Sequence, residues 1–172
     1  MNKDFNSETN VKILKSKHSK LNSRRLSQRL NAVFGQEGVL RIIDANLNRC
    51  REGLRVVEDS LRFVLNDEIL YKKIRGIRHN VDGILRNIYK DLIKKRNTFV
   101  DSGRKVPETF RRELPDLVVA NFKRVQESLR VLEEYSKTFL PEVSANLKEQ
   151  RYEVYDLEKE VYLKYKFVFF SS

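Results

Sequence analysis

The chain has 172 residues, of which 40% are hydrophobic and 34% charged, with only six Gly and three Pro. This length leaves no room for a second enzyme-sized domain, and the composition excludes a disordered or loop-rich chain. The net charge of +11 suits an anionic partner, whether a phosphate compound, a nucleic acid or a membrane surface.

The first predicted segment is a basic tail over residues 1–38, which supplies +5 of the net charge. Residues 9–36 contain no acidic residue and many Lys, Arg and Ser. We predict a disordered or weakly helical tail, with a short amphipathic helix over residues 20–34. An organelle transit peptide stays open as an alternative. Residues 39–172 are the predicted domain.

Two helices are predicted next, over residues 40–65 and 66–95. Apolar residues in the first recur with the alternating spacing of four and three that helix packing requires: Ile43, Leu47, Cys50, Leu54, Val57, Leu61 and Val64. The second continues the spacing through Leu70, Ile74, Ile77, Val81, Ile84 and Ile88. Asn66 is the expected cap of this helix, and the short connection predicts a helical hairpin.

A loop follows over residues 97–107, because Gly103 and Pro107 interrupt the pattern. The spacing resumes in a third helix, from about Val118 to Pro141, and in a fourth that contains Leu147 and Val161. No strand-like alternation is visible. The sequence therefore predicts an all-α fold, a four-helix bundle.

The chain also repeats itself. The stretch ANLNRCREGLRVVE, residues 45–58, returns as ANFKRVQESLRVLE, residues 120–133, with eight of fourteen positions identical. A weaker repeat relates RHNVDGI, residues 78–84, to RYEVYDL, residues 151–157. We therefore predict two duplicated helical hairpins with approximate internal two-fold symmetry.

Polar residues retained in both copies lie beside the apolar face of their helices at 100° per residue. Those of interest here are Asn46, Arg49 and Glu52 in the first copy, and Asn121, Arg124 and Glu127 in the second. Together they would offer guanidinium groups for a phosphate, amides for a heterocycle and carboxylates for a metal or an amine. The alternative is that Arg49 with Glu52, and Arg124 with Glu127, which are three residues apart, only form surface or inter-helix ion pairs.

Other features limit the possible chemistry. Cys50 is the only cysteine, which excludes an internal disulfide and fits a reducing compartment, so we expect a cytoplasmic protein. Its place on the apolar face predicts a buried, inert thiol. We expect no metal site of protein ligands alone and no membrane partner, since no apolar run approaches the roughly 20 residues that span a bilayer. The usual nucleotide-loop, zinc-protease and serine-hydrolase motifs are missing from the sequence.

Three stretches carry a family resemblance: RIIDANLNRCREGLRVVEDSLRFVL, ANFKRVQESLRVLEEYSK and QRYEVYDLE. In this order they resemble the helical N-terminal domain that precedes the barrel in two-domain thiamine-phosphate synthases, such as those of cyanobacteria. The resemblance covers about residues 40–163. Arg96-Asn97-Thr98 and Asp101-Ser102-Gly103 stand where the family has Arg-Asp-Thr and Asp-x-Gly, so Asn97 replaces an acid.

The resemblance implies thiamine biosynthesis. Domains of this type are classed with hydroxymethylpyrimidine phosphate kinases, which implies a phosphorylated pyrimidine as ligand, with ATP and Mg²⁺ as cofactors. A complete synthase is not expected, because a barrel needs about 200 or more residues with alternating strands and helices.

On this hypothesis the candidate residues take three roles. The phosphates would be held by Arg49, Arg96 and Arg124, and the pyrimidine edge by Asn46 and Asn121. The metal or the substrate hydroxyl would be held by the catalytic candidates Glu52, Asp101 and Glu127.

Two alternatives belong to other functional classes. The first is a non-catalytic docking or regulatory module for a separately encoded thiamine-phosphate synthase barrel, motivated by the fused arrangement in the relatives. The second is a helical RNA-binding protein, which is supported only by the basic charge. Aromatic residues do not interleave with the basic tail as a stacking platform requires, which disfavours a nucleic-acid partner.

Overall fold

The computed structural model describes residues 37–99, 101–103, 105–107, 113–137 and 141–166. The predicted basic tail lies almost entirely outside these residues. The short helix predicted over residues 20–34 and the transit-peptide alternative fall there too.

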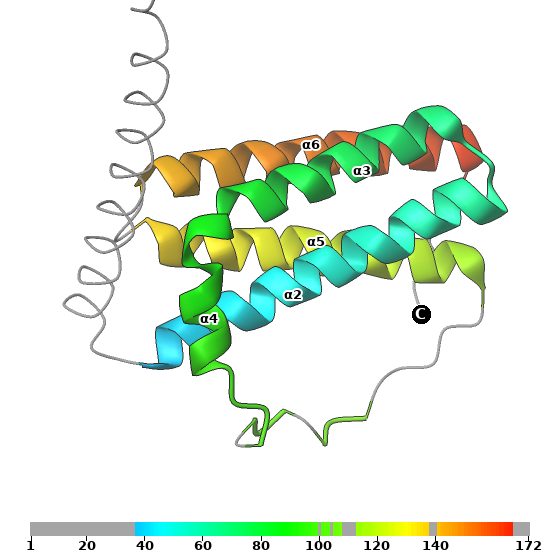
Figure 1. Ribbon diagram of the computed structural model, residues 1–172. Helices are drawn as coiled ribbons and strands as arrows, with labels where there is room; N and C mark the ends of the chain where they lie inside the picture. Colours follow the sequence, from blue (N-terminus) through cyan, green and yellow to red (C-terminus); the bar gives the residue numbers. More distant parts are fainter. Residues whose placement is uncertain (1–36, 100, 104, 108–112, 138–140, 167–172) are drawn as a thin grey trace, which may run out of the picture.

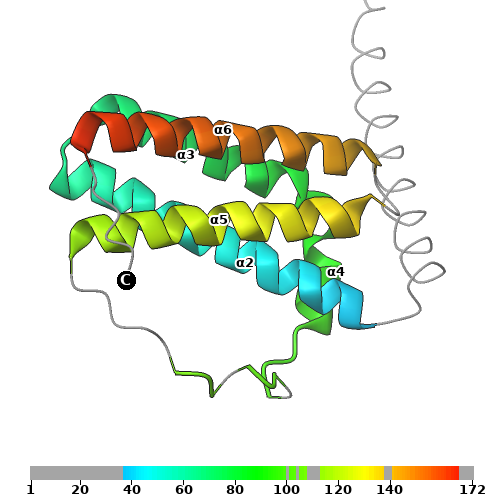
Figure 2. The same cartoon turned by 180° about the vertical axis from the view of Figure 1, so that it is seen from behind.

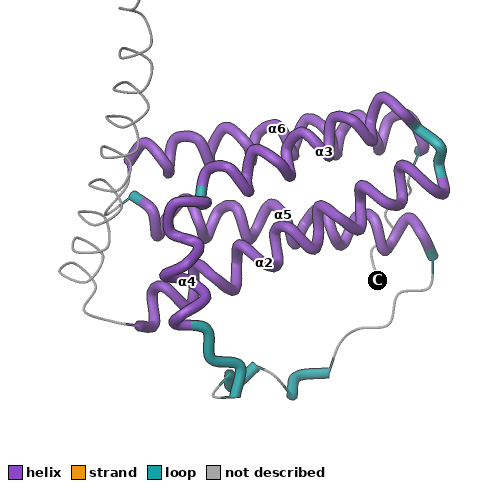
Figure 3. The backbone as a smooth tube through the Cα atoms, in the orientation of Figure 1, coloured by secondary structure: helices purple, strands orange, loops and turns teal. Residues whose placement is uncertain are grey.

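The described part of the chain is helical apart from turns and loops. Its elements are α2 (Glu37–Asp59), the π-helical turn η1 (Ser60–Val64), α3 (Glu68–Ile84), the 3-10 turn η2 (Arg86–Ile88), α4 (Tyr89–Lys95), α5 (Leu114–Ser136) and α6 (Pro141–Tyr165). No strand occurs among these residues, as the colouring of Figure 3 shows. The predicted all-α class is confirmed.

The four long helices form two layers, α3 with α6 and α2 with α5 (Figure 1, and from behind in Figure 2). Neighbouring helices run antiparallel: α2 packs against α3 and α5, and α6 packs against the same two helices. The shorter α4 crosses α2 at the end opposite the turn between α2 and α3. The two-fold relation between the hairpins stays a prediction.

The core consists of the apolar residues that the spacing predicts, with one clear exception. Ile43, Leu54 and Leu61 are fully buried on α2 and η1, but Val64 is 58% exposed. The cause is the π-helical turn, in which the Leu65 amide donates to the Ser60 carbonyl five residues earlier. This wider turn rotates the last residues away from the apolar face, so the prediction for Val64 was wrong.

The start of α3 differs from the prediction by one residue. Asp67 is the N-cap, and its Oδ1 accepts a hydrogen bond from the Leu70 amide at 3.1 Å. Asn66 instead adopts a left-handed conformation with φ of 50°, which Asn tolerates better than most residues. Asn66 therefore makes the turn between α2 and α3, and Asp67 caps the helix.

The second predicted helix is interrupted rather than continuous to residue 95. α3 ends at Ile84, and the chain changes direction through η2 before α4 begins at Tyr89. Leu85, Ile88 and Leu92 stay buried across the break. The spacing of apolar residues shows which residues are buried but not the direction of the helix axis. It therefore continues unchanged through this break and cannot reveal it.

Candidate functional site

The retained asparagines lie inside the contact between α2 and α5. Asn46 and Asn121 are 7% and 4% exposed, and their amides donate to the carbonyls of Ile42 and Leu117 at 2.8 Å each. The amide nitrogens are thus used within their own helices, whereas Asn121 Oδ1 is buried and has no hydrogen-bond partner among the described residues. The predicted role of reading a pyrimidine edge stays a prediction, for which the described contacts leave only the Asn121 oxygen as an unused acceptor.

Gly53 lies at a close contact between α2 and α5. A Cβ atom at this position would lie 2.8 Å from Val125 Cγ2 and 3.2 Å from the Asn121 carbonyl oxygen. Any larger residue would therefore push α2 and α5 apart. The absence of a side chain lets the two helices meet beside the repeated polar residues.

A second group of retained residues forms buried ion pairs. The Glu58 side chain is 1% exposed and accepts from Arg78 Nε at 2.6 Å and from Arg55 Nη1 at 3.2 Å. This contact links α2 to α3. Taking both ions out of water is costly, and the paired guanidinium groups offset that cost.

The second copy of the repeat makes the same set of contacts between α5 and α6. Glu133 is 3% exposed, and it accepts from Arg151 Nε at 3.0 Å and from Arg130 Nη1 at 2.9 Å. The repeat of residues 45–58 in residues 120–133 is thus partly structural. Sequence reasoning missed these networks, although Arg78 and Arg151 open the two stretches of the weaker repeat.

The third group is exposed. Arg49, Glu52, Arg124 and Glu127 lie at the surface, and their side chains make no ion pair or hydrogen bond with another described residue. The alternative prediction, pairs of Arg49 with Glu52 and of Arg124 with Glu127, does not hold for the described residues. The fold uses Arg55 and Arg130 in the ion pairs instead.

These four charged residues flank one crossing of α2 and α5, and we call them the charged face. Glu52 precedes Gly53 in the sequence, and Arg124 precedes Val125, the residue that Gly53 contacts. Two guanidinium groups and two carboxylates are therefore presented beside the contact of the two helices at Gly53. Such a surface can bind a phosphate through charge-assisted hydrogen bonds.

Arg96 lies elsewhere, on the far side of α2, and it already has a carboxylate partner. Its Nε and Nη2 donate to Asp44 Oδ2 and Oδ1, both at 2.7 Å, in a bidentate pair. The hydrogen bond to Asp44, with a contribution from Tyr89, raises the pKa of Arg96 above its ordinary value. A ligand phosphate would have to compete with Asp44, a partner that sequence reasoning missed.

Asp101 belongs to an exposed turn of the loop between α4 and α5. Its Oδ1 accepts from the Gly103 amide at 2.9 Å, which accounts for the Asp-Ser-Gly sequence as turn chemistry. Asn97 acts similarly, accepting from the Phe99 amide at 3.1 Å. Among the described residues, neither Arg96 nor Asp101 contacts the charged face.

No group of three or more His, Cys, Asp or Glu in the described part of the chain could hold a metal ion. Glu52 and Glu127 offer separate exposed carboxylates. Mg²⁺ in nucleotide sites is commonly held by one or two carboxylates together with substrate phosphates. Glu52 and Glu127 would therefore hold Mg²⁺ only in that form, in company with a bound phosphate.

Cys50 is buried, as predicted. Burial, helped by the nearby charge of Asp82 and opposed by that of Arg51, raises the pKa of the thiol to about 12. A thiol with this pKa is protonated at neutral pH and is a poor nucleophile. Cys50 thus serves the core and takes no part in a site.

Comparison with known proteins gives the family. The ThiD2 family model matches residues 41–160. Among the curated relatives are thiamine-phosphate synthases of Synechococcus sp. (strain CC9605), 45% identical over 121 residues, and of Nostoc punctiforme, 40% identical over 126 residues. The synthase of Rhodopirellula baltica is 41% identical over 130 residues.

These matches cover 70%, 72% and 73% of this chain, but only 34%, 35% and 35% of the relatives. The chain thus spans about a third of the length of the curated relatives it matches. No solved structure matches it. None of the described helices is long and apolar enough to cross a membrane. The chain belongs to the ThiD2 family and corresponds to the helical domain of thiamine-phosphate synthases.

Proposed function

We propose that this chain binds hydroxymethylpyrimidine phosphate in thiamine biosynthesis, through the charged face of α2 and α5. One observation carries the proposal. Arg49, Glu52, Arg124 and Glu127 are retained in both copies of the repeat, yet they make no side-chain contact that the described fold needs. The other charged residues retained in the repeat have structural partners.

The chemistry of the charged face suits this ligand. Arg49 and Arg124 supply the planar guanidinium groups that bind phosphate oxygens in pairs. Outside the tail the chain keeps a net charge of +6, which favours an anionic ligand. The relatives are thiamine-phosphate synthases, which supports a ligand from that pathway.

We propose further that the charged face transfers a phosphoryl group from ATP to the bound pyrimidine phosphate. Glu52 and Glu127 would hold Mg²⁺ or the accepting group, while Arg49 and Arg124 hold phosphates. Bound Mg²⁺ would neutralise negative charge on the phosphoryl group during its transfer. Arg96 joins such a site only if the substrate displaces it from Asp44, and Asp101 only if the loop brings it to the face.

Calorimetric titration with hydroxymethylpyrimidine phosphate, in moderate salt with Mg²⁺, tests the binding. We expect one-site saturation for the wild type and at least roughly ten-fold weaker binding for Arg124→Ala, the usual cost of losing a charge-assisted hydrogen bond. Lys159→Ala on α6 is the control, because it removes the same charge from another exposed site. An affinity unchanged by Arg124→Ala, with helical content intact, would remove the site assignment.

A separate assay tests the phosphoryl transfer. With ATP and Mg²⁺ present, we expect the wild type to convert the pyrimidine phosphate to its diphosphate and to release ADP. Glu52→Gln and Glu127→Gln should slow this conversion more than they weaken binding. Saturable binding without ADP release would contradict the transfer and leave the binding proposal standing.

A second candidate function is docking on a separate synthase barrel, and one surface favours it. Phe63, Val64, Ile69 and Leu163 are between 58% and 66% exposed. They come from the ends of η1 and α6 and the start of α3, at the end of the molecule where Lys164 contacts Asp67. Exposed apolar residues at one end of a molecule are typical of interaction sites.

Sedimentation velocity of this chain mixed with a single-domain thiamine-phosphate synthase tests the docking. A complex at micromolar concentration that Leu163→Ser abolishes is the expected result. If the two proteins sediment independently, docking is wrong and pyrimidine phosphate binding has to stand alone.

A further inference from the structure

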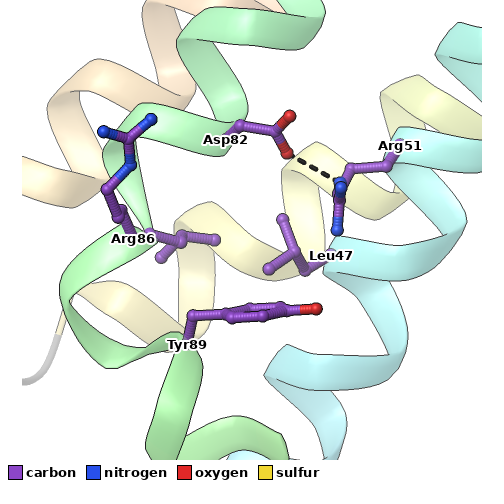
Figure 4. A pocket seen from close by; sticks show the side chains of 6 residues that line it. Leu47, Arg51, Asp82, Arg86 and Tyr89 are labelled. Atoms are coloured by element: carbon purple, nitrogen blue, oxygen red, sulfur yellow. Dashed lines mark ion pairs between the residues drawn. The ribbon is translucent and has the colours of Figure 1, made fainter.

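A hollow of about 190 Å³ lies where α2, α3 and α4 meet, away from the charged face (Figure 4). It is lined by Leu47, Arg51, Asp82, Leu85, Arg86 and Tyr89. At 100° per residue, Arg51 lies about 200° around α2 from Arg49 of the charged face. The hollow and the charged face therefore occupy opposite sides of the same helix.

The change of direction after α3 creates this hollow. α3 ends at Ile84, and the chain passes through η2 into α4, which crosses α2 instead of continuing along it. Leu47 and Leu85 are each 3% exposed and form an apolar floor. The repeat aligns Leu47 with Phe122, a larger residue that is fully buried at its own position.

The rim of the hollow is polar and carries an excess of positive charge. Arg51 Nε lies 2.7 Å from Asp82 Oδ1, and both side chains are partly exposed. Arg86 is exposed and makes no ion pair with another described residue. The rim thus carries two guanidinium groups and one carboxylate, and since only Arg51 pairs with Asp82, the positive charge of Arg86 is left for an anionic ligand.

Tyr89 supplies an aromatic wall opposite Asp82 (Figure 4). It lies next to Arg96, and a hydrogen bond between the two side chains contributes to the raised pKa of Arg96. Because Asp44 holds Arg96 by two hydrogen bonds, the phenol is tied to α2 through Arg96. A tyrosine fixed in this way offers a planar surface for stacking without first having to be ordered.

We propose that this hollow binds a single-ring aromatic anion, at a site separate from the charged face. Its volume exceeds only slightly the roughly 150 Å³ that holds benzene in an engineered cavity, so one ring fits and a nucleotide does not. The ring lies on Leu47 and Leu85 beside Tyr89. Its phosphate or carboxylate group binds Arg86, with Arg51 as second donor, and Asp82 accepts a ring donor where the ligand carries one.

Calorimetry on the full chain tests this site, with phenyl phosphate and benzoate as single-ring probes and inorganic phosphate as the anion alone. We expect one-site binding of at least one ring probe and no saturation with inorganic phosphate. Arg86→Ala should weaken ring-probe binding roughly ten-fold, as for loss of a charge-assisted hydrogen bond, and Tyr89→Leu several-fold. Arg124→Ala, on the charged face, should leave it unchanged.

Leu47→Phe provides a variant that fills the hollow. It should abolish ring-probe binding, keep the melting temperature within a few degrees of the wild type and leave hydroxymethylpyrimidine phosphate binding at the charged face intact. The proposal is overturned if neither ring probe saturates the wild type, or if inorganic phosphate binds as tightly as they do. Probe binding that depends on Arg124 and not on Arg86 would also overturn it, because it would place the probes on the charged face.

Discussion

The repeated residues owe their retention to different physical causes. Glu58 and Glu133 are buried carboxylates that need two guanidinium partners each, whereas Glu52 and Glu127, six residues before them, are exposed. A buried charge that loses its partner is costly, whereas an exposed one is hydrated. Mutations in the two groups should therefore have different effects on stability and binding.

Glu133→Ala should lower the free energy of unfolding by about 3 kcal/mol or more, because it leaves the guanidinium of Arg151 buried without its carboxylate. Glu127→Ala, on the exposed side of the same helix, should change it by less than about 0.5 kcal/mol. Urea unfolding of both variants measures the difference. Equal destabilisation by the two substitutions would contradict the assignment of Glu133 as structural.

Asp67 gives the stability of the fold a dependence on pH. Burial alone would raise its pKa, but hydrogen bonds from Lys164, Tyr165 and the Leu70 amide outweigh this and lower the pKa to about 2. A depressed carboxylate pKa adds stability above the unfolded pKa of about 4, and this stability is lost as the pH falls towards 2. The free energy of unfolding should therefore decrease as the pH falls from about 4 to 2.

Asp67→Asn tests this because it keeps a capping side chain and removes the charge. At pH 7 it should destabilise the protein by about 1–2 kcal/mol, a figure discounted for the exposed Lys164 partner. The difference from the wild type should shrink as the pH falls from about 4 to 2. Thermal unfolding across this range measures it, and a gap that stays constant down to pH 2 would be inconsistent with the ionised pair.

Cys50 should not react with a disulfide reagent in the folded protein at pH 8. Its thiol is buried, and its pKa of about 12 leaves almost no thiolate at that pH. Addition of denaturant should release one equivalent of reactive thiol. Rapid stoichiometric labelling of the native protein would show that the α2 core opens more readily than the structure indicates.

At the scale of elements, the apolar spacing was sufficient to predict four long helices but not their irregularities. The π-helical turn that exposes Val64 and the break after Ile84 leave no mark in the spacing, because they change direction rather than hydrophobicity. The prediction of Asn66 as the cap was wrong by one residue, because Asn and Asp both favour helix N-termini and the sequence alone does not separate them. The backbone conformation distinguishes them.

Glycines in α2 and α3 test the contact between α2 and α5. Gly53→Ala should destabilise the protein by about 1–3 kcal/mol, because the new methyl group would overlap Val125. Gly76→Ala in α3 meets no atom within 4 Å and should stabilise the helix by about 0.5–1 kcal/mol. Chemical denaturation of the pair compares them. Stabilisation by both substitutions would show that α2 and α5 are not in close contact at Gly53.

For the whole molecule, the repeat identified the candidate residues. It could not show which of them form structural ion pairs and which are left for a ligand. Arg49 and Arg55 are equally retained and both lie beside the apolar face, yet only Arg55 reaches a buried carboxylate. The difference depends on tertiary packing, because α3 brings Arg78 into contact with Glu58, the partner of Arg55. The hollow beside Tyr89 was not predictable either, since it depends on the path of α4 across α2.

The central claim is that Arg49 and Arg124 bind the phosphate of a pyrimidine precursor, and one thermodynamic cycle tests it most directly. The affinities of hydroxymethylpyrimidine and of its phosphate are measured by calorimetry for the wild type and for the Arg49→Ala, Arg124→Ala double variant. We predict that the phosphate group improves wild-type affinity by at least about ten-fold, and that the double variant loses this gain. An equal gain in both proteins would show that the phosphate binds elsewhere and would contradict the proposed function of the charged face.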